Sequence, residues 1–461
     1  MIRALSFLII GISLMSGAKA VSPDEYNPDT QAVLNLIRND KLDLILPSAM
    51  RDNDVDMWIN VARDGQPSSL EYEFGHFDGY LIFTDTGEHI ERAMFGGIFT
   101  GPGGINNVDV IGSTKVARAV AGYEYDPEDL SAYDEIRQYV AKNDPKTIAV
   151  NYSDWLSVAD DISYTQFLKL SKILGEKYAQ RIVSAEYLIT DYRSRRTLRE
   201  IVVQTNTLEI ARQNALKNLS RIIPGVTTIG DCACDARIYY SDKSERIREP
   251  HATSWIRHPD YVFQKGDFFA FSGDANWMDF GPNSFGVDTK HHAYILRDGE
   301  DNVPDELQYA WDQTKKAQRI IREQVEVGMT SGEALTAIVR ALEEENYIYT
   351  PFTDDPADDY RMIQDMLAGK NQSGFYVDLH AMGNNGGTLV TVGPSIAPFR
   401  RDRDDIIIRE NHILAFEFAV HTHLSDRPSY PITINFSNPQ VVTNLGIEWI
   451  QPANEGIFVI H

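Results

Sequence analysis

The chain has 461 residues, more than the roughly 250–300 that usually share one hydrophobic core, so we expect two domains. Hydrophobic residues make up 43% of the sequence, which excludes a largely disordered protein. The formal net charge of −24 disfavours binding to nucleic acid or to an anionic membrane surface, and we expect neither partner.

The first twenty residues have the pattern of a signal peptide. Arg3 precedes an apolar run from Ala4 to Met15, and the segment ends in the small-x-small sequence Ala18-Lys19-Ala20. The run is shorter than the roughly 20 residues that span a bilayer, so an uncleaved membrane anchor is the less favoured alternative. We expect residues 1–20 to be removed and the mature protein to be exported, periplasmic or secreted, without a stable membrane span.

Strand-like and helical patterns alternate through the next part of the chain. The sequence predicts a helix over 30–38, strands over 55–61, 79–84 and 147–151, and a helix over 164–174. Strands alternating with helices are typical of an α/β domain, which we place at residues 21–195.

A basic patch, Arg193-Ser194-Arg195-Arg196, follows this domain. Directly after it, Thr197-Leu198-Arg199-Glu200 has the form of a capping box that opens a long helix. We interpret the patch as the domain boundary and assign residues 196–461 to the second domain. The alternative is that the patch is merely a solvated loop.

The second domain begins with a long helix and continues with both strands and helices. The sequence predicts strands over 267–271 and 287–296, helices over 307–325 and 334–342, the latter opened by a capping box at 330–333, and closing strands over 413–421 and 457–460. We predict an α+β fold for the whole chain.

The only two cysteines are Cys232 and Cys234. On a regular helix their side chains would point about 200° apart, and on a strand they would stand about 6.6 Å apart. Both arrangements are poor for a disulfide, so we expect buried free thiols. An intermolecular or redox role is the alternative.

Candidate functional residues lie on separate strands. Alternation over 287–296 places Asp288, Lys290, His292 and Tyr294 on one face. Glu417 lies among apolar residues, where burial of a carboxylate is costly unless a cation or a metal compensates. The alternative is an edge strand whose glutamate faces water.

Two further residues are ambiguous when they are considered alone. His380 precedes a loop rich in Gly and Asn, and Glu455 precedes the last apolar strand. Alone, such a histidine is more often structural than a metal ligand, and such a glutamate is more often a surface residue.

The order of Asp288, His380, Glu417 and Glu455 resembles the metal ligands of the pita-bread metallopeptidases, the superfamily of methionine aminopeptidase, aminopeptidase P, prolidase and creatinase. The similar segments are Gly286–Leu296 for the bridging Asp, Leu379–Asn384 for the His, Ala415–Phe418 for the first Glu, and Glu455–Val459 for the last Glu. The segment Met50–Ile59 also resembles the start of the upstream domain in the aminopeptidase P and creatinase branch. The resemblance implies an N-terminal creatinase-like α/β domain followed by a C-terminal pita-bread domain.

The family chemistry uses five ligands for two divalent ions, and this sequence departs from that pattern. The family's first Asp corresponds to Ser272, whose hydroxyl cannot replace a bidentate carboxylate, although Asp274 or Asp279 in the longer following loop could supply one. The resemblance therefore implies one ion in preference to two. The expected ligands of that ion, which would be Mn, Co, Zn or Fe, are Asp288, His380, Glu417 and Glu455.

A second departure concerns the histidine that assists substrate binding and proton transfer in the family. The corresponding position is Gly387, and Asn385 stands where the closest branch has another histidine. His421 and His423 share the face of Glu417, but they lie roughly 13 and 20 Å along the strand. We interpret them as rim residues rather than substitutes.

The resemblance implies an exported metallo-aminopeptidase that hydrolyses Xaa-Pro bonds at the amino-terminal ends of peptides. Its ion would activate water, with Glu417 as the catalytic proton carrier, and the missing histidines imply reduced activity. One alternative is a catalytically degenerate binding or scaffold protein, and another is a creatinase-like hydrolase of small molecules. Because the family often forms dimers, a homodimer is among the implied assemblies.

Overall fold

The computed structural model describes residues 28–63, 66, 68–98, 107–120, 129–232, 234–240, 258–273, 288–351, 362–363, 365–382, 392–398, 403–425, 427–451 and 456–461. The predicted signal peptide lies outside this part of the chain. Among the described helices, none combines the length and the apolar character that crossing a membrane requires.

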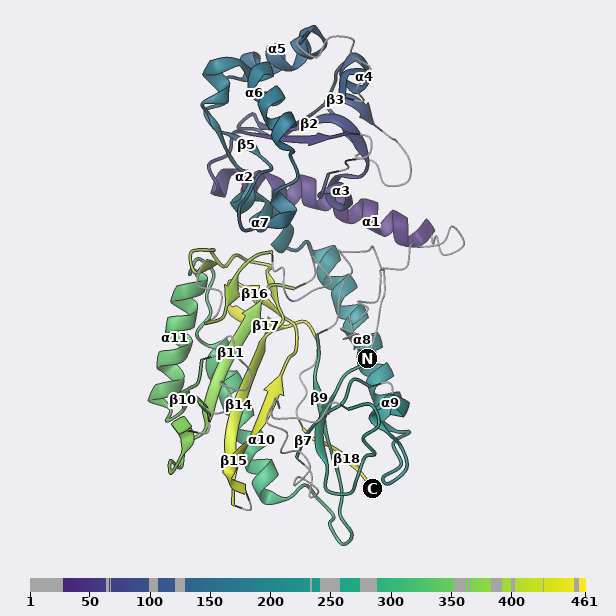
Figure 1. Cartoon of the computed structure of the whole chain (residues 1–461), viewed down its shortest axis with the longest axis vertical. Coiled ribbons are helices and arrows are strands. Elements are labelled where there is room, and N and C mark those ends of the chain that lie inside the picture. The colour runs from purple at the N-terminus through teal and green to yellow at the C-terminus, as the bar shows by residue number, and fades with distance from the viewer. Residues whose placement is uncertain are drawn as a thin grey trace, which may run out of the picture.

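The first structural unit is a mixed sheet with helices on both faces (Figure 1). Its strand order is β4-β3-β2-β1-β5-β6. The strands are β1 (Met57–Ala62), β2 (Phe77–Asp85), β3 (Ile90–Ile98), β4 (Val110–Ile111), β5 (Ile148–Val150) and β6 (Ile182–Ser184). The helices are α1 (Pro28–Asp40), α2 (Leu46–Asp52), α3 (Glu71–Phe74), α4 (Lys115–Val120), α5 (Asp134–Asn143), α6 (Tyr164–Ala179) and α7 (Glu186–Ser194), and a π-helix (Lys41–Ile45) joins α1 to α2.

Strand β1 explains this layered arrangement. Successive side chains of a strand point to opposite faces, and every residue of β1 is buried. Trp58 packs in the cluster that includes residues of α2, α3 and α7, whereas Ile59 packs in the cluster that includes residues of α4, α5 and α6. The sheet therefore needs helices on both faces, as the predicted α/β domain required.

The second unit contains the remaining sheets (Figure 1). Strands β7 (Arg237–Tyr240), β8 (Phe268–Phe271), β9 (His291–Ile295) and β18 (Phe458–Ile460) form a sheet in the order β18-β9-β8-β7. Strands β10 (Ile348–Tyr349), β11 (Gly374–His380), β14 (Glu417–Leu424) and β15 (Arg427–Phe436) form another, and β12 (Ser395–Ile396) pairs with β11. Strands β13 (Ile413–Leu414), β16 (Gln440–Thr443) and β17 (Gly446–Trp449) form the third.

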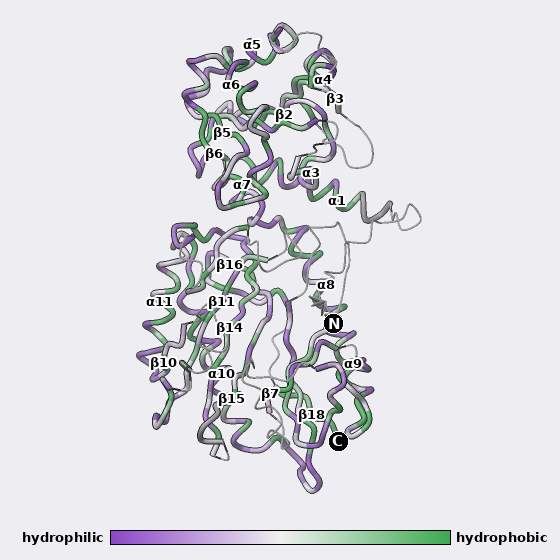
Figure 2. Tube along the Cα trace, viewed as in Figure 1, coloured by the Kyte–Doolittle hydropathy of each residue, from purple (hydrophilic) through white to green (hydrophobic). Residues whose placement is uncertain are grey.

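The helices of this unit include α8 (Leu198–Leu219), α9 (Ile229–Cys232), α10 (Asp305–Arg322) and α11 (Ser331–Glu344). Both predicted capping boxes are confirmed, with Thr197 and Thr330 accepting from the backbone at the starts of α8 and α11. Hydrophilic and hydrophobic positions alternate along α11 (Figure 2), and its apolar side joins α10 and the large sheet in one core.

Two predicted strands differ from the observed ones. The predicted strand over 413–421 is two strands in different sheets, because β13 ends at Leu414 and β14 begins at Glu417. Phe416 lies between them with a φ of 49°, a left-handed conformation outside the range of a regular strand. The predicted strand over 287–296 is shorter, since β9 begins at His291 and leaves Asp288 and Lys290 in the approach to it.

The prediction of free thiols is wrong. Cys232 and Cys234 form a disulfide with a Cα–Cα distance of 5.2 Å. Cys232 is the last residue of α9, so the pair belongs to neither the regular helix nor the regular strand that the prediction assumed. At a helix end the two Cα atoms come within the range that a disulfide spans.

The basic patch is buried, so its interpretation as a solvated loop is wrong. Arg193 Nε lies 2.6 Å from Glu73 Oε1, and both side chains are nearly inaccessible to solvent. Arg196 Nη1 lies 3.0 Å from Glu200 Oε1. Lys41 donates from Nζ to the carbonyl oxygen of Arg195 at 2.6 Å. This set of charges joins the first unit to α8.

Removing one member of a buried ion pair leaves the other charged group without compensation. We expect Arg193→Ala to lower the free energy of unfolding by about 3–5 kcal/mol, because the Glu73 carboxylate stays buried. Arg340→Ala is the control, since Arg340 pairs with Glu344 in solvent and should change stability by less than about 1 kcal/mol. Chemical denaturation of both variants measures this, and equal midpoints would contradict the prediction.

Candidate metal centre

Asp288, His380 and Glu417 come together in the structure, as the sequence resemblance implied. One ligand atom from each residue lies within 4.8 Å of the others. Asp288 lies in the approach to β9, His380 is the last residue of β11, and Glu417 is the first residue of β14. The remaining candidates Asp274, Asp279 and Glu455, and also Asn385 and Gly387, lie outside the described residues.

The positions of His380 and Glu417 depend on the pairing of their strands. Glu417 lies opposite Asp378 in the antiparallel register of β11 and β14. The backbone N–H of Ala415 donates to the carbonyl oxygen of His380 at 2.8 Å. Between these two links the chain turns at Phe416, which is fully buried despite its positive φ. Such a conformation costs about 1–3 kcal/mol and persists only where the surroundings enforce it.

Ser437 connects the approach to β9 with this turn. Its hydroxyl group is 2.9 Å from the carbonyl oxygen of Asp288 and 3.1 Å from that of Ala415. The N–H of Lys290 donates to the carbonyl oxygen of Ser437 at 2.9 Å. Residues 288–290 are therefore fixed relative to the first residue of β14.

The ammonium group of Lys290 lies between the two carboxylates. Its Nζ atom is 2.7 Å from Glu417 Oε1 and 3.3 Å from Asp288 Oδ1, and only 8% of the side chain is exposed. Burial opposes the charge on each partner. The Lys290 ammonium nevertheless keeps the pKa of Glu417 well below its ordinary value, with a further contribution from His380. Asp288 and Glu417 likewise raise the pKa of Lys290 despite its burial.

The sequence contained a signal for this role of Lys290. Alternation placed it on the same face as Asp288, but no partner was assigned to it. Its partner Glu417 is 127 residues away in the sequence, and local patterning cannot reveal such a contact.

The residues present do not fit a divalent ion while Lys290 holds this position. Asp288, His380 and Glu417 supply oxygen and nitrogen ligands of suitable kinds. However, the ammonium of Lys290 already contacts one oxygen of each carboxylate. A divalent ion bound there would place its two positive charges beside the positive charge of Lys290. Ser272 follows β8 and offers a hydroxyl group in place of a carboxylate, and its N–H donates to the carbonyl oxygen of Cys234.

His421 is buried within the sheet and is not a rim residue, contrary to the prediction. Its Nδ1 atom is 2.8 Å from the hydroxyl oxygen of Thr433, and burial lowers its pKa to about 3. It lies opposite Gly374, at the far end of the β11–β14 pairing from Glu417. His423 is half-buried one alternation further along β14. Neither histidine adjoins the cluster of Asp288, His380 and Glu417.

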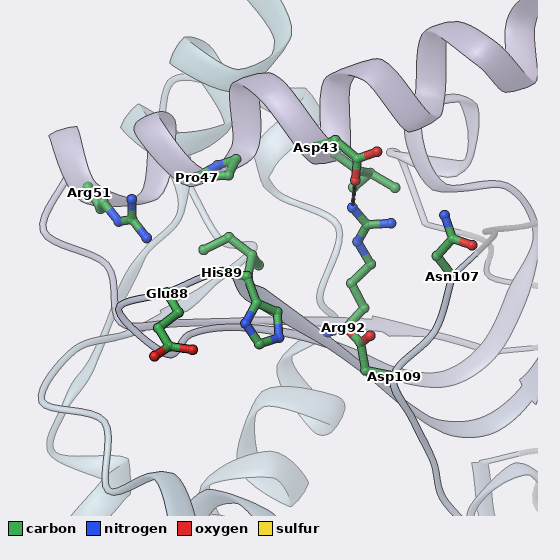
Figure 3. Close-up of a pocket in the computed structure, with 10 residues that line it drawn as sticks. Asp43, Pro47, Arg51, Glu88, His89, Arg92, Asn107 and Asp109 are labelled. Carbon is green, nitrogen blue, oxygen red and sulfur yellow. Dashed lines mark hydrogen bonds and ion pairs between the residues drawn. The ribbon is translucent and has the colours of Figure 1, made fainter.

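A cavity of about 290 Å³ lies elsewhere, in the first unit (Figure 3). It opens between the helical segment that includes Asp43 and the turn that joins β2 to β3. Its arginines are already ion-paired, Arg92 with Asp43 and Arg51 with Asp85. We assign it no ligand.

Comparison with known proteins identifies the fold. No model of a protein family matches the chain, and no curated protein matches it. Among solved structures, an X-Pro aminopeptidase from Thermotoga maritima MSB8 is similar with a TM-score of 0.52 at 14% identity, over 90% of this chain and 100% of that one. The chain has the pita-bread fold with its upstream α/β domain, as the sequence resemblance implied.

Other solved structures are similar at lower scores. An Xaa-Pro dipeptidase from Bacillus anthracis has a TM-score of 0.47 at 14% identity, covering 92% of this chain and 100% of its own. A prolidase from Pyrococcus horikoshii OT3 has a TM-score of 0.42 at 13% identity, covering 92% of this chain and 97% of its own.

His292 continues the face of Lys290 into the core. Its ring lies between aromatic residues, with ring centroids 5.0 Å from Trp311 and 5.9 Å from Phe436. Its Nε2 atom is 3.1 Å from the carbonyl oxygen of Asn435. Burial lowers its pKa to about 3, so the imidazole is neutral in the folded protein at ordinary pH.

This buried histidine predicts a loss of stability in acid. The unfolded chain binds the proton near pH 6.5, whereas the folded chain does so only near 3, so the stabilisation is present above 6.5 and is lost as the pH falls. Between pH 6.5 and 5 we expect His292→Phe to gain about 2 kcal/mol relative to the wild type. Denaturation at both pH values measures this difference, with the exposed His258→Phe as the control variant. If the difference in stability between His292→Phe and the wild type is the same at both pH values, the assignment of a neutral, buried His292 is wrong.

Proposed function

We propose that the protein is exported and binds the amino-terminal end of peptides on a pita-bread fold, without hydrolysing them by means of a metal ion. The observation that carries this proposal is the Lys290 ammonium between Asp288 and Glu417, 3.3 and 2.7 Å from their oxygens. A metal-dependent peptidase would need these carboxylates for its ion, and the ammonium would stand as a further positive charge beside that ion.

The cluster contains groups of both charges. The carboxylates of Asp288, Glu417 and Asp378 lie near the cations Lys290 and Arg237, and His380 also acts on Glu417. Asp378 is half-buried opposite Glu417. The α-ammonium group of a peptide is a cation of the kind that carboxylates bind through charge-assisted hydrogen bonds. The similar aminopeptidase of known structure is named for acting at X-Pro bonds, which supports Xaa-Pro peptides as the first ligands to test.

Export is supported by two observations. The first twenty residues have the composition of a signal peptide. The disulfide between Cys232 and Cys234 is of a kind that persists in oxidising compartments such as the periplasm or the extracellular space.

A second candidate is weak hydrolysis with one divalent ion, which the grouping of Asp288, His380 and Glu417 favours. This reaction requires the Lys290 ammonium to leave both carboxylates. The substrate would be an Xaa-Pro peptide or, as in the creatinase branch, a small molecule.

Calorimetry and a turnover assay on residues 21–461 separate these candidates. We expect Xaa-Pro peptides to bind without added metal, and N-acetylated peptides to bind at least about tenfold more weakly because they lack the α-ammonium. Glu417→Gln should weaken binding, whereas Glu344→Gln, a change in the exposed pair on α11, should not.

Two outcomes would contradict the proposal. Equal binding of free and acetylated peptides would exclude recognition of the amino terminus. Turnover that requires Mn²⁺ or Co²⁺ and disappears in Glu417→Gln would establish the second candidate instead.

A further inference from the structure

Moving the Lys290 side chain away from the cluster would cost free energy. Its backbone N–H is bound to the carbonyl oxygen of Ser437, which fixes the start of the side chain beside the cluster. The side chain is 8% exposed, so its charge must find partners within the protein. Its partners are the oxygens of Asp288 and Glu417 at 3.3 and 2.7 Å.

The carboxylates have the same requirement. Glu417 follows the fully buried Phe416, and its side chain is 18% exposed, whereas that of Asp288 is 23% exposed. Two such carboxylates whose oxygens lie within 4.8 Å of each other repel unless a positive charge lies between them. One protonated amine meets this requirement, and so would one divalent ion. The two together are unfavourable, because a divalent ion beside the ammonium would bring three positive charges into one small and poorly exposed site.

We propose that Lys290 is a built-in cation that takes the place of a metal ion at this site, holding Asp288 and Glu417 in position and excluding divalent ions. This inference rests on the proposed function only in placing no metal ion at the cluster. Its tests measure metal binding, whereas peptide binding tests the recognition of the amino terminus, so the failure of one is distinguishable from the failure of the other.

A purely structural ion pair makes a different prediction. If Lys290 only stabilises the fold, its removal lowers stability and leaves the metal affinity unchanged. If Lys290 replaces an ion, its removal leaves two carboxylates and His380 arranged to receive one. The readout that distinguishes the two roles is therefore a gain of metal binding.

Titration of the full mature protein with Mn²⁺ alone, followed by calorimetry and by electron paramagnetic resonance, provides this readout. We expect Lys290→Met, which retains much of the side-chain bulk without the charge, to bind one ion per chain about a hundredfold or more tightly than the wild type. Lys290→Arg retains the cation and should resemble the wild type. Lys265→Met is the matched control, because Lys265 forms an exposed ion pair with Asp298 and should have no effect on metal binding.

Two results would overturn the inference. One is a wild-type protein that binds one Mn²⁺ as tightly as Lys290→Met does and loses it in Glu417→Gln. The other is a folded Lys290→Met protein, recognised by its cooperative unfolding, that shows no gain of metal binding. If Lys290→Met does not fold, the wild-type titration decides alone. Absence of an ion at the site then supports the inference, and an ion that Glu417→Gln abolishes overturns it.

Discussion

Two carboxylates from distant parts of the chain share one ammonium group, and the centre of the second unit depends on that balance. Asp288 precedes β9, and Glu417 begins β14, so electrostatic attraction through Lys290 joins segments of two different sheets. Loss of the cation would leave two negative charges close together in a poorly hydrated place, which typically costs several kcal/mol. The pita-bread frame therefore holds a cluster in which one ammonium group lies between two carboxylates.

The backbone around this cluster is fixed by uncharged contacts. Ser437 binds the carbonyl oxygens of Asp288 and Ala415 with one hydroxyl group, and Phe416 turns with a positive φ to bring Glu417 onto its strand. A strained residue in this position indicates that the surrounding structure fixes the direction of the Glu417 side chain, at the cost of an unfavourable backbone conformation at Phe416. Asp288, His380 and Glu417 are thus brought together, with the Lys290 ammonium between the two carboxylates.

Local signals in the sequence predicted the fold well, whereas contacts between distant residues could not be predicted from them. The capping boxes at Thr197 and Thr330 were predictable because a cap needs only four neighbouring residues. The grouping of Asp288, His380 and Glu417 followed from a family resemblance rather than from periodicity. The turn at Phe416 was missed because an apolar run reads as one strand. Lys290 was placed on the correct face, but its partner could be found only in three dimensions.

The buried charges at the end of α7 have a consequence for how such a chain can be divided or recombined. Arg195 binds Asp191 and Asp52, while Arg196 donates to the carbonyl oxygen of Met382, close to His380 in the sequence. The connecting segment is therefore packed against both units and is not a linker. A chimaera that gave the second unit a foreign upstream partner would have to carry the segment around Lys41 to Asp52 with it. Whole domains are easily exchanged in proteins whose domains have solvent between them. In this protein such an exchange would break the buried ion pairs.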